Sequence, residues 1–263
     1  MAGARLLLVG DVMGKAGLTA VRRALPRLIA DRAVDFTIVN GENVAGGVGI
    51  TPPLAAELFA AGADAITTGN HVWRQREIRP YIEKEPRLLR PANFVEGQPG
   101  SGFGTYETAA GVPVAVVNLV GQVFMDPADN PFHAADRLLA RRPKAALVVV
   151  DFHAEVTSEK RAMGLHLDGR VTAVIGTHTH VQTADEQILP GGTAFITDVG
   201  MTGPHDSVIG MRKDLVLSRF VTGLPESFKP ATSGVLLQAV LVEADAATGK
   251  AARIERISLA IPD

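Results

Sequence analysis

The sequence predicts an α/β fold in which mixed β-sheets are flanked by helices. Short apolar runs rich in β-branched residues alternate with stretches of helical periodicity along the whole chain. Helices between the early and the late strands favour parallel pairing, whereas two pairs of runs with no helix between them favour antiparallel hairpins. We therefore expect one mixed sheet or two stacked sheets. No internal repeat and no Pro/Gly/Ser-rich linker interrupts the sequence, so the prediction is a single domain over residues 1–263.

The expected helices are identified by apolar spacing and by end signals. Residues 18–30 place apolar side chains on one helical face, and Pro26 within them predicts a kink or an early end. Thr51 and Pro52 are typical of a helix N-cap and first turn, and Gly62 would close that helix. Further helices are expected at residues 130–142, 158–165 and 215–221, and a charged segment at residues 74–84.

The expected strands are the short apolar runs. The runs at residues 105–108 and 112–118 are separated by Ala-Ala-Gly and predict a hairpin. Residues 234–243 and 252–261 predict a second, longer hairpin. The remaining strands are expected at residues 6–9, 36–39, 65–68, 145–150, 171–175 and 194–197.

The composition excludes several classes of site and partner. The chain has no cysteine, which rules out disulfides, thiolate metal sites, iron–sulfur clusters and cysteine nucleophiles. The 26 Lys and Arg residues are balanced by 28 Asp and Glu residues, so duplex nucleic acid is not expected as a partner, whereas a small phosphorylated ligand is compatible. No apolar window approaches the roughly 20 residues of a membrane span, and the N-terminal apolar stretch is too short for a signal peptide. We expect a cytoplasmic protein without membrane contact, with an apolar fraction that would allow a homo-oligomer.

Side chains suited to metal binding follow five of the predicted strands. In open α/β sheets, ligands bind at the carboxyl ends of the strands. His178 and His180 form the strongest single signal, since residues two apart on an extended segment project to one side. The candidates, in chain order, are Asp11, Glu42, Asn43, Asn70, His71, His153, His178 and His180.

Each candidate also has a structural interpretation when it is taken alone. Asp11 is typical of a turn, Asn70 and His71 of a helix cap, and His153 of a hydrogen-bonded core histidine. Their concentration at one sheet edge favours a metal site, which explains all of them together. Oxygen and imidazole ligands without sulfur suit iron, manganese or zinc. Because the candidates are too many for one tetrahedral ion, we expect two metal ions about 3.5–4 Å apart, bridged by a carboxylate and a hydroxide.

These strand-end motifs resemble those of the calcineurin-like metallophosphoesterases, which run GD, GN, GNH, H and GHxH. Two departures stand out: Met13 replaces the histidine that is usual in the first motif, and Glu42 replaces the usual bridging aspartate. In this chain the motifs are Gly10-Asp11, Gly41-Glu42-Asn43, Gly69-Asn70-His71, His153 and Gly176-Thr177-His178-Thr179-His180.

Both departures match the YmdB-like 2′,3′-cyclic nucleotide 2′-phosphodiesterase family, which the chain resembles over nearly its whole length. The resemblance implies a calcineurin-like sandwich of mixed sheets flanked by helices. It further implies a metal-dependent hydrolase that converts 2′,3′-cyclic nucleotides to 3′-nucleotides with iron, or manganese in its place. The segments that carry the resemblance are GDVMGKAG, NGENVAGGVGIT, TTGNHVW, VDFHAEVTSEK, GTHTHVQTAD and TDVGMTGPHDSVIG.

The resemblance also implies a role for each site residue. Glu42 would bridge the two metals, and Asn43 would replace the ligand lost at Met13. His71 would be the acid beside the metal pair. One metal would be held by Asp11, Glu42, Asn43 and His180, and the other by Glu42, Asn70, His153 and His178.

The chemistry of such a site favours in-line attack on a phosphodiester. Two metals neutralise charge on the phosphate oxygens and lower the pKa of a bound water, so that a bridging hydroxide can attack near neutral pH. His71 could then protonate the departing 2′-oxygen, because imidazole titrates near this pH. Two alternatives stay open: a phosphatase or phosphodiesterase of broad specificity, and a regulatory nucleotide-binding protein with slow turnover.

Other residues have both a structural and a functional interpretation. Residues 46–49 could form a flexible loop or a backbone-amide nest for phosphate. His205 could touch the substrate from a loop or lie on the surface. Trp73 could stack on a base or pack on the sheet. Asp151 could orient His153 or face solvent at a strand end. Two histidines fall in predicted helices and are interpreted as structural: His133 and His166.

Overall fold

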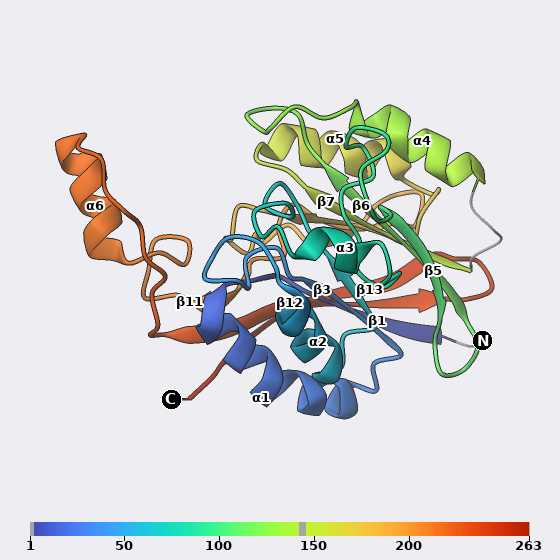
Figure 1. Cartoon of the computed structure of the whole chain (residues 1–263). Helices are drawn as coiled ribbons and strands as arrows, with labels where there is room; N and C mark the ends of the chain where they lie inside the picture. The colour runs from blue at the N-terminus through green and yellow to red at the C-terminus, as the bar shows by residue number, and fades with distance from the viewer. Residues whose placement is uncertain (1–2, 142–145, 263) are drawn as a thin grey trace.

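A computed structural model describes residues 3–141 and 146–262, in which two β-sheets stack face to face (Figure 1). Within these residues the first sheet has the strand order β2-β11-β12-β1-β3-β4, with β13 paired to β12. Its strands are β1 (Gly3–Val9), β2 (Asp11–Val12), β3 (Phe36–Asn40), β4 (Ala65–Thr67), β11 (Met201–Pro204), β12 (Val235–Asp245) and β13 (Ala251–Ala260).

The second sheet has the order β5-β6-β7-β8-β10-β9 among the described residues. Its strands are β5 (Phe103–Glu107), β6 (Pro113–Val120), β7 (Leu147–His153), β8 (Ala173–Thr177), β9 (Gln187–Ile188) and β10 (Ala194–Ile196). Strands β6, β7, β8 and β10 are parallel, as are β1, β3 and β4 in the first sheet. Both predicted hairpins are present, as β5–β6 and β12–β13.

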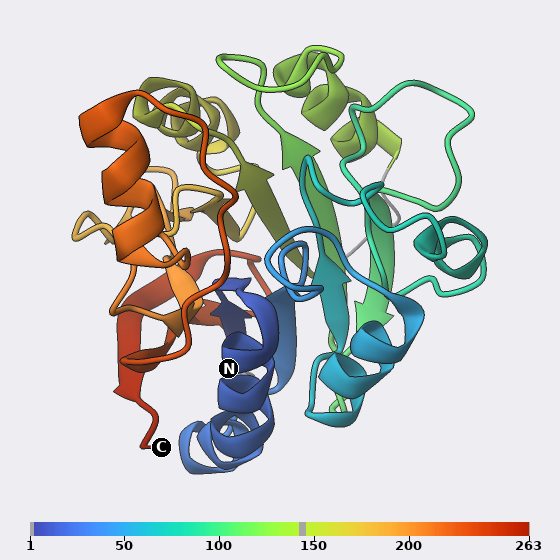
Figure 2. The same cartoon turned by 60° about the vertical axis from the view of Figure 1, so that its left-hand side comes forward.

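Helices cover the outer faces of the two sheets. Helices α1 and α2 pack on the first sheet, and α4 and α5 pack on the second, as Figure 1 shows. Figures 1 and 2 both place α6, in orange, at one outer side of the molecule. The helices are α1 (Gly14–Arg32), α2 (Pro52–Ala60), α3 (Ile78–Ile82), α4 (Pro131–Arg141), α5 (Thr157–Leu167) and α6 (Lys213–Thr222).

Alternation along the strands builds the core. In β1, Leu6 and Leu8 point between the two sheets, whereas Leu7 and Val9 point toward α1 and α2. The prediction of mixed sheets flanked by helices is therefore confirmed, and of the two expected arrangements the stacked one is correct. No helix within residues 3–141 and 146–262 is long and apolar enough to cross a membrane.

Several boundaries differ from the sequence prediction. Helix α1 continues through Pro26, so the early end expected there is not observed. A proline inside a helix removes one backbone hydrogen bond, and here Leu25 and Leu28 are buried on the same helix and offset that loss. Strands β2, β9 and β11 were not expected, because two to four residues show no readable period. Arg142 and Ala145, at the ends of a predicted helix and strand, lie outside the described residues.

Candidate metal centre

The eight candidate side chains come together where the carboxyl ends of strands from both sheets meet. The first sheet contributes five of them, from β2 and from the segments after β3 and β4, and the second sheet contributes the three histidines that follow in the chain. Contacts between the sheets define the meeting point, since Glu42 approaches His153 and Asp11 approaches His178. Asp11 itself is the first residue of β2 rather than part of a turn.

Three potential ligand atoms converge on His153 Nε2. This nitrogen lies 3.1 Å from Glu42 Oε1, 3.1 Å from Asn70 Oδ1 and 3.0 Å from His178 Nδ1. The ligand atoms of Glu42, His153 and His178 all lie within 4.8 Å of one another. Carboxylate, amide and imidazole groups at this spacing can surround one ion.

A second group of ligand atoms lies on the other side of Glu42. His180 Nε2 lies 3.7 Å from Asp11 Oδ1 and 3.1 Å from Asn43 Nδ2. Asn43 Nδ2 also donates to Glu42 Oε1 at 3.2 Å, so the same carboxylate oxygen is shared by both groups. Within the described chain, Asp11 Oδ1 is buried without a hydrogen-bond partner. A buried carboxylate oxygen in this condition is costly unless a cation satisfies it.

The three imidazoles are held at the nitrogen that faces away from the centre. Metal-binding histidines usually donate their other ring N–H to a carboxylate, a carbonyl or a similar acceptor, which fixes the ring and its tautomer. Each of these rings has such a partner. The pairs are His153 Nδ1 with Thr177 Oγ1 at 2.9 Å, His178 Nε2 with Glu155 Oε2 at 3.0 Å, and His180 Nδ1 with the Ile209 carbonyl at 2.9 Å.

Asp151 orients His153 through Thr177. The Thr177 hydroxyl donates to Asp151 Oδ1 at 2.7 Å, so it must accept from His153 Nδ1–H, and Nε2 of this ring faces the centre. Asn40 and Thr67 donate to the other oxygen of Asp151. Burial raises the pKa of Asp151 to about 6, although the nearby His153 and the threonine hydroxyls lower it. Of the two interpretations of Asp151, the buried partner of His153 is the one observed.

The charges of the centre depend on one another. Burial raises the pKa of Glu42, but His153 and His71 outweigh it and hold that pKa well below its ordinary value. Burial lowers the pKa of His153, but Glu42 and Asp11 outweigh it and raise the pKa to about 9. Burial and the charge of His153 lower the pKa of His178 to about 3. Without a metal, a proton on His153 therefore compensates the buried carboxylates.

The residues present fit a pair of metal ions. The donor set contains oxygen and imidazole nitrogen, Asp11 has an unsatisfied buried oxygen among the described residues, and the rings are oriented toward the centre. The backbone also approaches closely at Gly69, where a Cβ would lie 2.2 Å from His153 Cδ2 and 2.4 Å from Glu42 Oε2. Any larger residue at Gly69 would fill the space between these two side chains.

Met13 and Asn43, the two positions at which the first motifs depart from the usual pattern, differ in their surroundings. Met13 is buried, and its methyl group occupies space that a Cβ at Gly47 would enter at 2.7 Å. Asn43 reaches His180 and Glu42. Its Nδ2 faces the centre and its Oδ1 faces His71, and a half-turn of the amide would present the oxygen to a metal.

His71 lies at the accessible side of the centre. Its side chain is 26% exposed, whereas Glu42 beside it is fully buried. Its Nδ1 is 2.8 Å from Asn43 Oδ1 and 3.4 Å from Glu42 Oε1, and its backbone N–H donates to Glu42 Oε2 at 3.1 Å. The described hydrogen bonds of the ring are thus made at Nδ1, which leaves Nε2 to face a substrate.

The backbone between the two last histidines is not extended. His178 has φ 96° and His180 has φ 65°, in the left-handed region that non-glycine residues rarely adopt. The sequence expectation that these two residues share one side of an extended segment is therefore wrong. Both reach the centre because the chain turns at each of them.

The remaining candidates have structural surroundings. The backbone N–H groups of residues 46, 47 and 48 donate to carbonyls within their own loop, which favours the loop interpretation over a phosphate nest. Trp73 packs on the core and donates to Gln98 at 2.9 Å. His205 contacts the Met201 carbonyl at 3.1 Å, and His166 pairs with Asp136 at 3.0 Å. His133 lies on α4.

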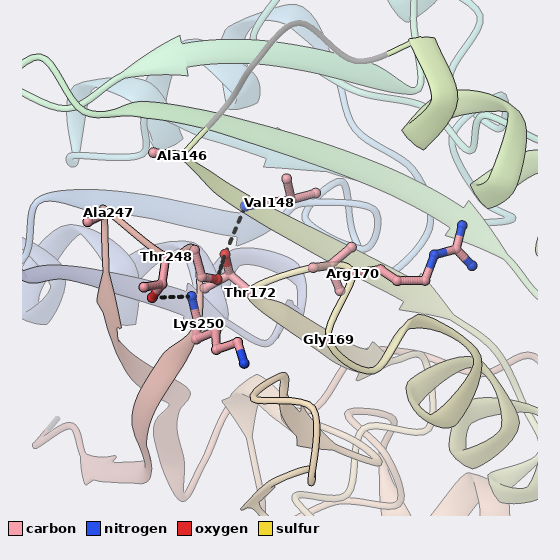
Figure 3. A pocket seen from close by; sticks show the side chains of 10 residues that line it. Ala146, Val148, Gly169, Arg170, Thr172, Ala247, Thr248 and Lys250 are labelled. Atoms are coloured by element: carbon pink, nitrogen blue, oxygen red, sulfur yellow. Dashed lines mark hydrogen bonds between the residues drawn. The ribbon is translucent and has the colours of Figure 1, made fainter.

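A separate pocket of about 180 Å³ lies at the opposite, amino-terminal ends of β7 and β8 (Figure 3). Its two cationic side chains, Arg170 and Lys250, extend in different directions. The Arg170 guanidinium is paired with Asp136 at 2.7 Å. None of the eight candidates lines this pocket.

The sequence did not identify the residues that hydrogen-bond to the candidate histidine rings. Thr177, Glu155 and Ile209 lie in segments quoted for the family resemblance, but their spacing alone predicts no contact with a candidate ligand. The useful signal is local: Thr177 sits beside His178, and Glu155 follows His153 by two residues. Which of them meets which ring depends on the pairing of β7 with β8, in which His153 lies opposite Thr177.

Comparison with known proteins agrees with the fold and the motifs. The model of the family described as YmdB-like protein matches residues 7–257. The chain is 50% identical to a 2′,3′-cyclic-nucleotide 2′-phosphodiesterase of Bacillus subtilis, over 96% of each chain. A solved structure of a hypothetical protein from Thermus thermophilus is 43% identical, with a TM-score of 0.92 over 98% of this chain and 100% of that one. A novel phosphatase from Mycoplasma pneumoniae is 36% identical, with a TM-score of 0.93 over 99% of this chain and 94% of that one. The chain belongs to the YmdB-like protein family.

Proposed function

We propose that this protein is a dinuclear-metal phosphodiesterase that hydrolyses 2′,3′-cyclic nucleotides to 3′-nucleotides. The observation that carries the proposal is the position of Glu42, whose carboxylate contacts both groups of ligand atoms. Two ions that share one carboxylate are typical of two-metal phosphoester hydrolysis. The substrate is inferred from the Bacillus subtilis relative, which is named for that reaction.

The proposed ligands divide as the two groups of contacts do. One position is assigned Asp11, Glu42, Asn43 and His180, and the other Glu42, Asn70, His153 and His178. Iron or manganese is proposed for both, and zinc is compatible with the same donors. When bound, such a metal pair neutralises charge on the phosphate and supplies a nucleophile from water near neutral pH.

The protein side chains orient the reaction and supply the proton. We assign His71 as the general acid, because it is partly exposed beside the ligands and its Nδ1 is held by Asn43 Oδ1. After the half-turn that presents Asn43 Oδ1 to a metal, Asn43 Nδ2 would donate to His71 Nδ1, and Nε2 would carry the proton that the departing 2′-oxygen takes up. Thr177, Glu155 and the Ile209 carbonyl keep the three ligand rings turned toward the centre.

The decisive experiment is metal analysis of protein purified without added metal, with an assay on the same sample. We expect two metal ions per chain, and a 3′-nucleotide as the product from 2′,3′-cyclic AMP. One ion or none would contradict the shared role of Glu42. Turnover slower than about one per hour with both ions bound would favour the regulatory alternative, since typical kcat values are 1–10³ s⁻¹.

A phosphatase of broader specificity is the second candidate, because the similar Mycoplasma pneumoniae protein is described as a phosphatase. The ratio of kcat/KM for 2′,3′-cyclic AMP, 3′,5′-cyclic AMP and a phosphomonoester separates the two. We expect the 2′,3′-cyclic substrate to be strongly preferred. Equal values for all three would favour the broad phosphatase.

Domain organisation, location and assembly complete the proposal. A single catalytic domain is supported by the core between the sheets, which joins residues from both ends of the sequence, such as Leu8 and Val242. A cytoplasmic location and a homo-oligomer are proposed from the sequence. Cell fractionation and light scattering of the purified protein test them.

A further inference from the structure

A buried ion pair lies directly behind the last two histidines of the centre. Lys160 of α5 and Asp198, which follows β10, are 1% and 0% exposed, and Lys160 Nζ lies 2.7 Å from Asp198 Oδ2. The lysine stem passes the backbone of Gly176, where a Cβ would lie 3.0 Å from Lys160 Cδ. Burying two charges is costly unless each is fully hydrogen-bonded. The other bonds of this carboxylate therefore indicate what the pair holds in place.

Asp198 binds the residue between the two histidines. Its Oδ2 accepts from the Thr179 backbone N–H at 3.0 Å and from the Thr179 hydroxyl at 2.7 Å, in addition to Lys160. Its Oδ1 accepts from the Gly200 backbone N–H at 2.8 Å. The carboxylate is thus anchored on one side to α5 and to the chain after β10, and on the other side to Thr179.

Thr179 needs such an anchor because both of its neighbours have strained backbones. His178 and His180 have positive φ values of 96° and 65°, and neither is glycine. Residues in this region persist only where the surroundings over-determine them. The two bonds from Thr179 to one carboxylate oxygen fix the backbone between them.

The two strained histidines face different ligand groups. His178 Nδ1 lies against His153, and His180 Nε2 lies against Asn43. Relaxation of the backbone at Thr179 would therefore displace one ligand of each proposed metal position. No other described carboxylate contacts Thr179.

We propose that Lys160 and Asp198 act through Thr179 as a clamp that positions His178 and His180 for metal binding. The clamp rests on the proposed function, because it presumes that these histidines bind metal. Lys160 pairs with Asp198, and this carboxylate accepts four hydrogen bonds in all. These three residues are positioning residues, and none of them is assigned contact with the substrate.

The test is calorimetric titration of the chelated full-length protein with Mn²⁺, which does not depend on turnover. In Thr179→Val the hydroxyl donor is lost with little change in volume, and we expect the Mn²⁺ Kd to rise about 10–100-fold, as for other residues that orient ligands. Thr179→Ser keeps both donors and should restore the Kd to within about threefold of the original. In the loaded enzyme, Thr179→Val should lower kcat and leave KM for the cyclic nucleotide nearly unchanged.

Asp168→Asn is the matched control. Asp168 follows the far end of α5 from Lys160 and accepts from the backbone N–H groups of Gly191 and Thr193, so its loss should leave the Mn²⁺ Kd unchanged. The double variant Lys160→Met with Asp198→Asn removes both buried charges together, and it should raise the Kd at least as much as Thr179→Val.

The outcomes separate the clamp from the function on which it rests. If Thr179→Val and the double variant lower the thermal stability but bind two Mn²⁺ ions with the original Kd, the pair is only structural and the clamp is wrong. If the unaltered chain binds no Mn²⁺, both the clamp and the proposed function fail. If it binds two ions and does not hydrolyse cyclic nucleotides, the function fails, and a Thr179→Val Kd raised as expected still supports the clamp.

Discussion

Strands β7 and β8 begin and end in opposite environments. At their amino ends Val148 and Thr172 line the pocket of about 180 Å³, whose cation Arg170 is exposed and paired with Asp136 (Figure 3). At their carboxyl ends Asp151 and His153 are buried, and the nearby Asp11 Oδ1 has no hydrogen-bond partner among the described residues. Seven residues of β7 separate the two regions by roughly 20 Å.

The two ends of these strands differ in whether every charged group has a partner within the protein. Exposed ion pairs contribute little and are screened by water and salt. A buried carboxylate without a partner is costly, and a protein retains one where a ligand satisfies it. The pocket at the amino ends is open to solvent, whereas the candidate metal ligands lie at the carboxyl ends. Four substitutions or conditions test this contrast, in order of expected effect.

The largest effect is expected for Glu42→Gln. Glutamine keeps the shape but removes the charge shared by both ligand groups, so metal binding should fall at both positions. We expect kcat/KM for 2′,3′-cyclic AMP to fall about 10⁴-fold, equivalent to about 5 kcal/mol. Elemental analysis of the same preparation should show fewer than two ions.

Glu85→Gln is the control, since it removes a carboxylate that pairs with Arg87 at the surface. It should leave both the metal content and the activity unchanged. If Glu42→Gln kept both metal ions and full activity, the proposal that Glu42 is shared by two metal positions would be wrong.

The second test, at the same carboxyl ends of the strands, separates catalysis from metal binding. His71→Ala should keep both ions, because His71 is not among the assigned ligands, and should lower kcat about 10²–10³-fold through loss of the general acid. The loss should shrink for an ester with a good leaving group, such as a nitrophenyl phosphodiester. His166→Ala, on α5 and away from the centre, is the control.

Metal analysis decides the role of His71. A His71→Ala protein that lacks one ion, and regains its activity when metal is restored, would make His71 a ligand rather than the acid.

The sequence predicted which residues come together at the candidate centre, but it did not predict the hydrogen bonds that orient them. Residues such as Glu42 and His153 could be found because each follows a recognisable strand, and parallel strands end at a common edge. The bonds that orient them could not be found, because they join segments far apart in the sequence. Thr67 and Asp151, for example, meet only when the two sheets stack.

For the fold too, the sequence predicted what depends on local pattern and missed what depends on long-range contacts. The long strands and hairpins were predictable from local period, whereas the two-residue strand β2 is defined by its pairing with β11, which comes late in the chain. The helix through Pro26 also depends on packing, since local chemistry alone favours an end there. Local signals identified the longer elements, and long-range contacts decided their ends and formed the shortest strands.

The third effect concerns the proton on His153, which compensates the charge of the buried carboxylates when no metal is bound. The pKa of His153 is raised to about 9, from 6.5, so between these values the folded chain holds a proton that the unfolded chain has lost. This contribution to stability is complete below pH 6.5 and disappears as the pH rises through 9. The pKa of His180 is also raised and acts in the same direction.

We therefore expect the free energy of unfolding in EDTA to fall by about 3 kcal/mol between about pH 6.5 and about pH 9.5. Urea unfolding at several pH values measures it. The Mn²⁺-loaded protein should show a much smaller decrease, because the metal replaces the proton. Equal pH dependence with and without metal would mean that the proton and the metal do not share this site.

The smallest effect is expected at the amino ends of the same strands, where Lys250→Ala removes the second cation of the pocket. The Lys250 backbone bonds to Asp245 and Thr248 do not involve its side chain, so the hairpin should persist. A charge roughly 20 Å from His153 is beyond the Debye length of about 8–10 Å and should not attract the substrate phosphate. We expect kcat and KM within about twofold of the original, and a change in the free energy of unfolding of no more than about 0.5 kcal/mol. If KM instead rises tenfold or more, the substrate depends on the amino end as well, and the contrast between the two ends of β7 and β8 does not hold.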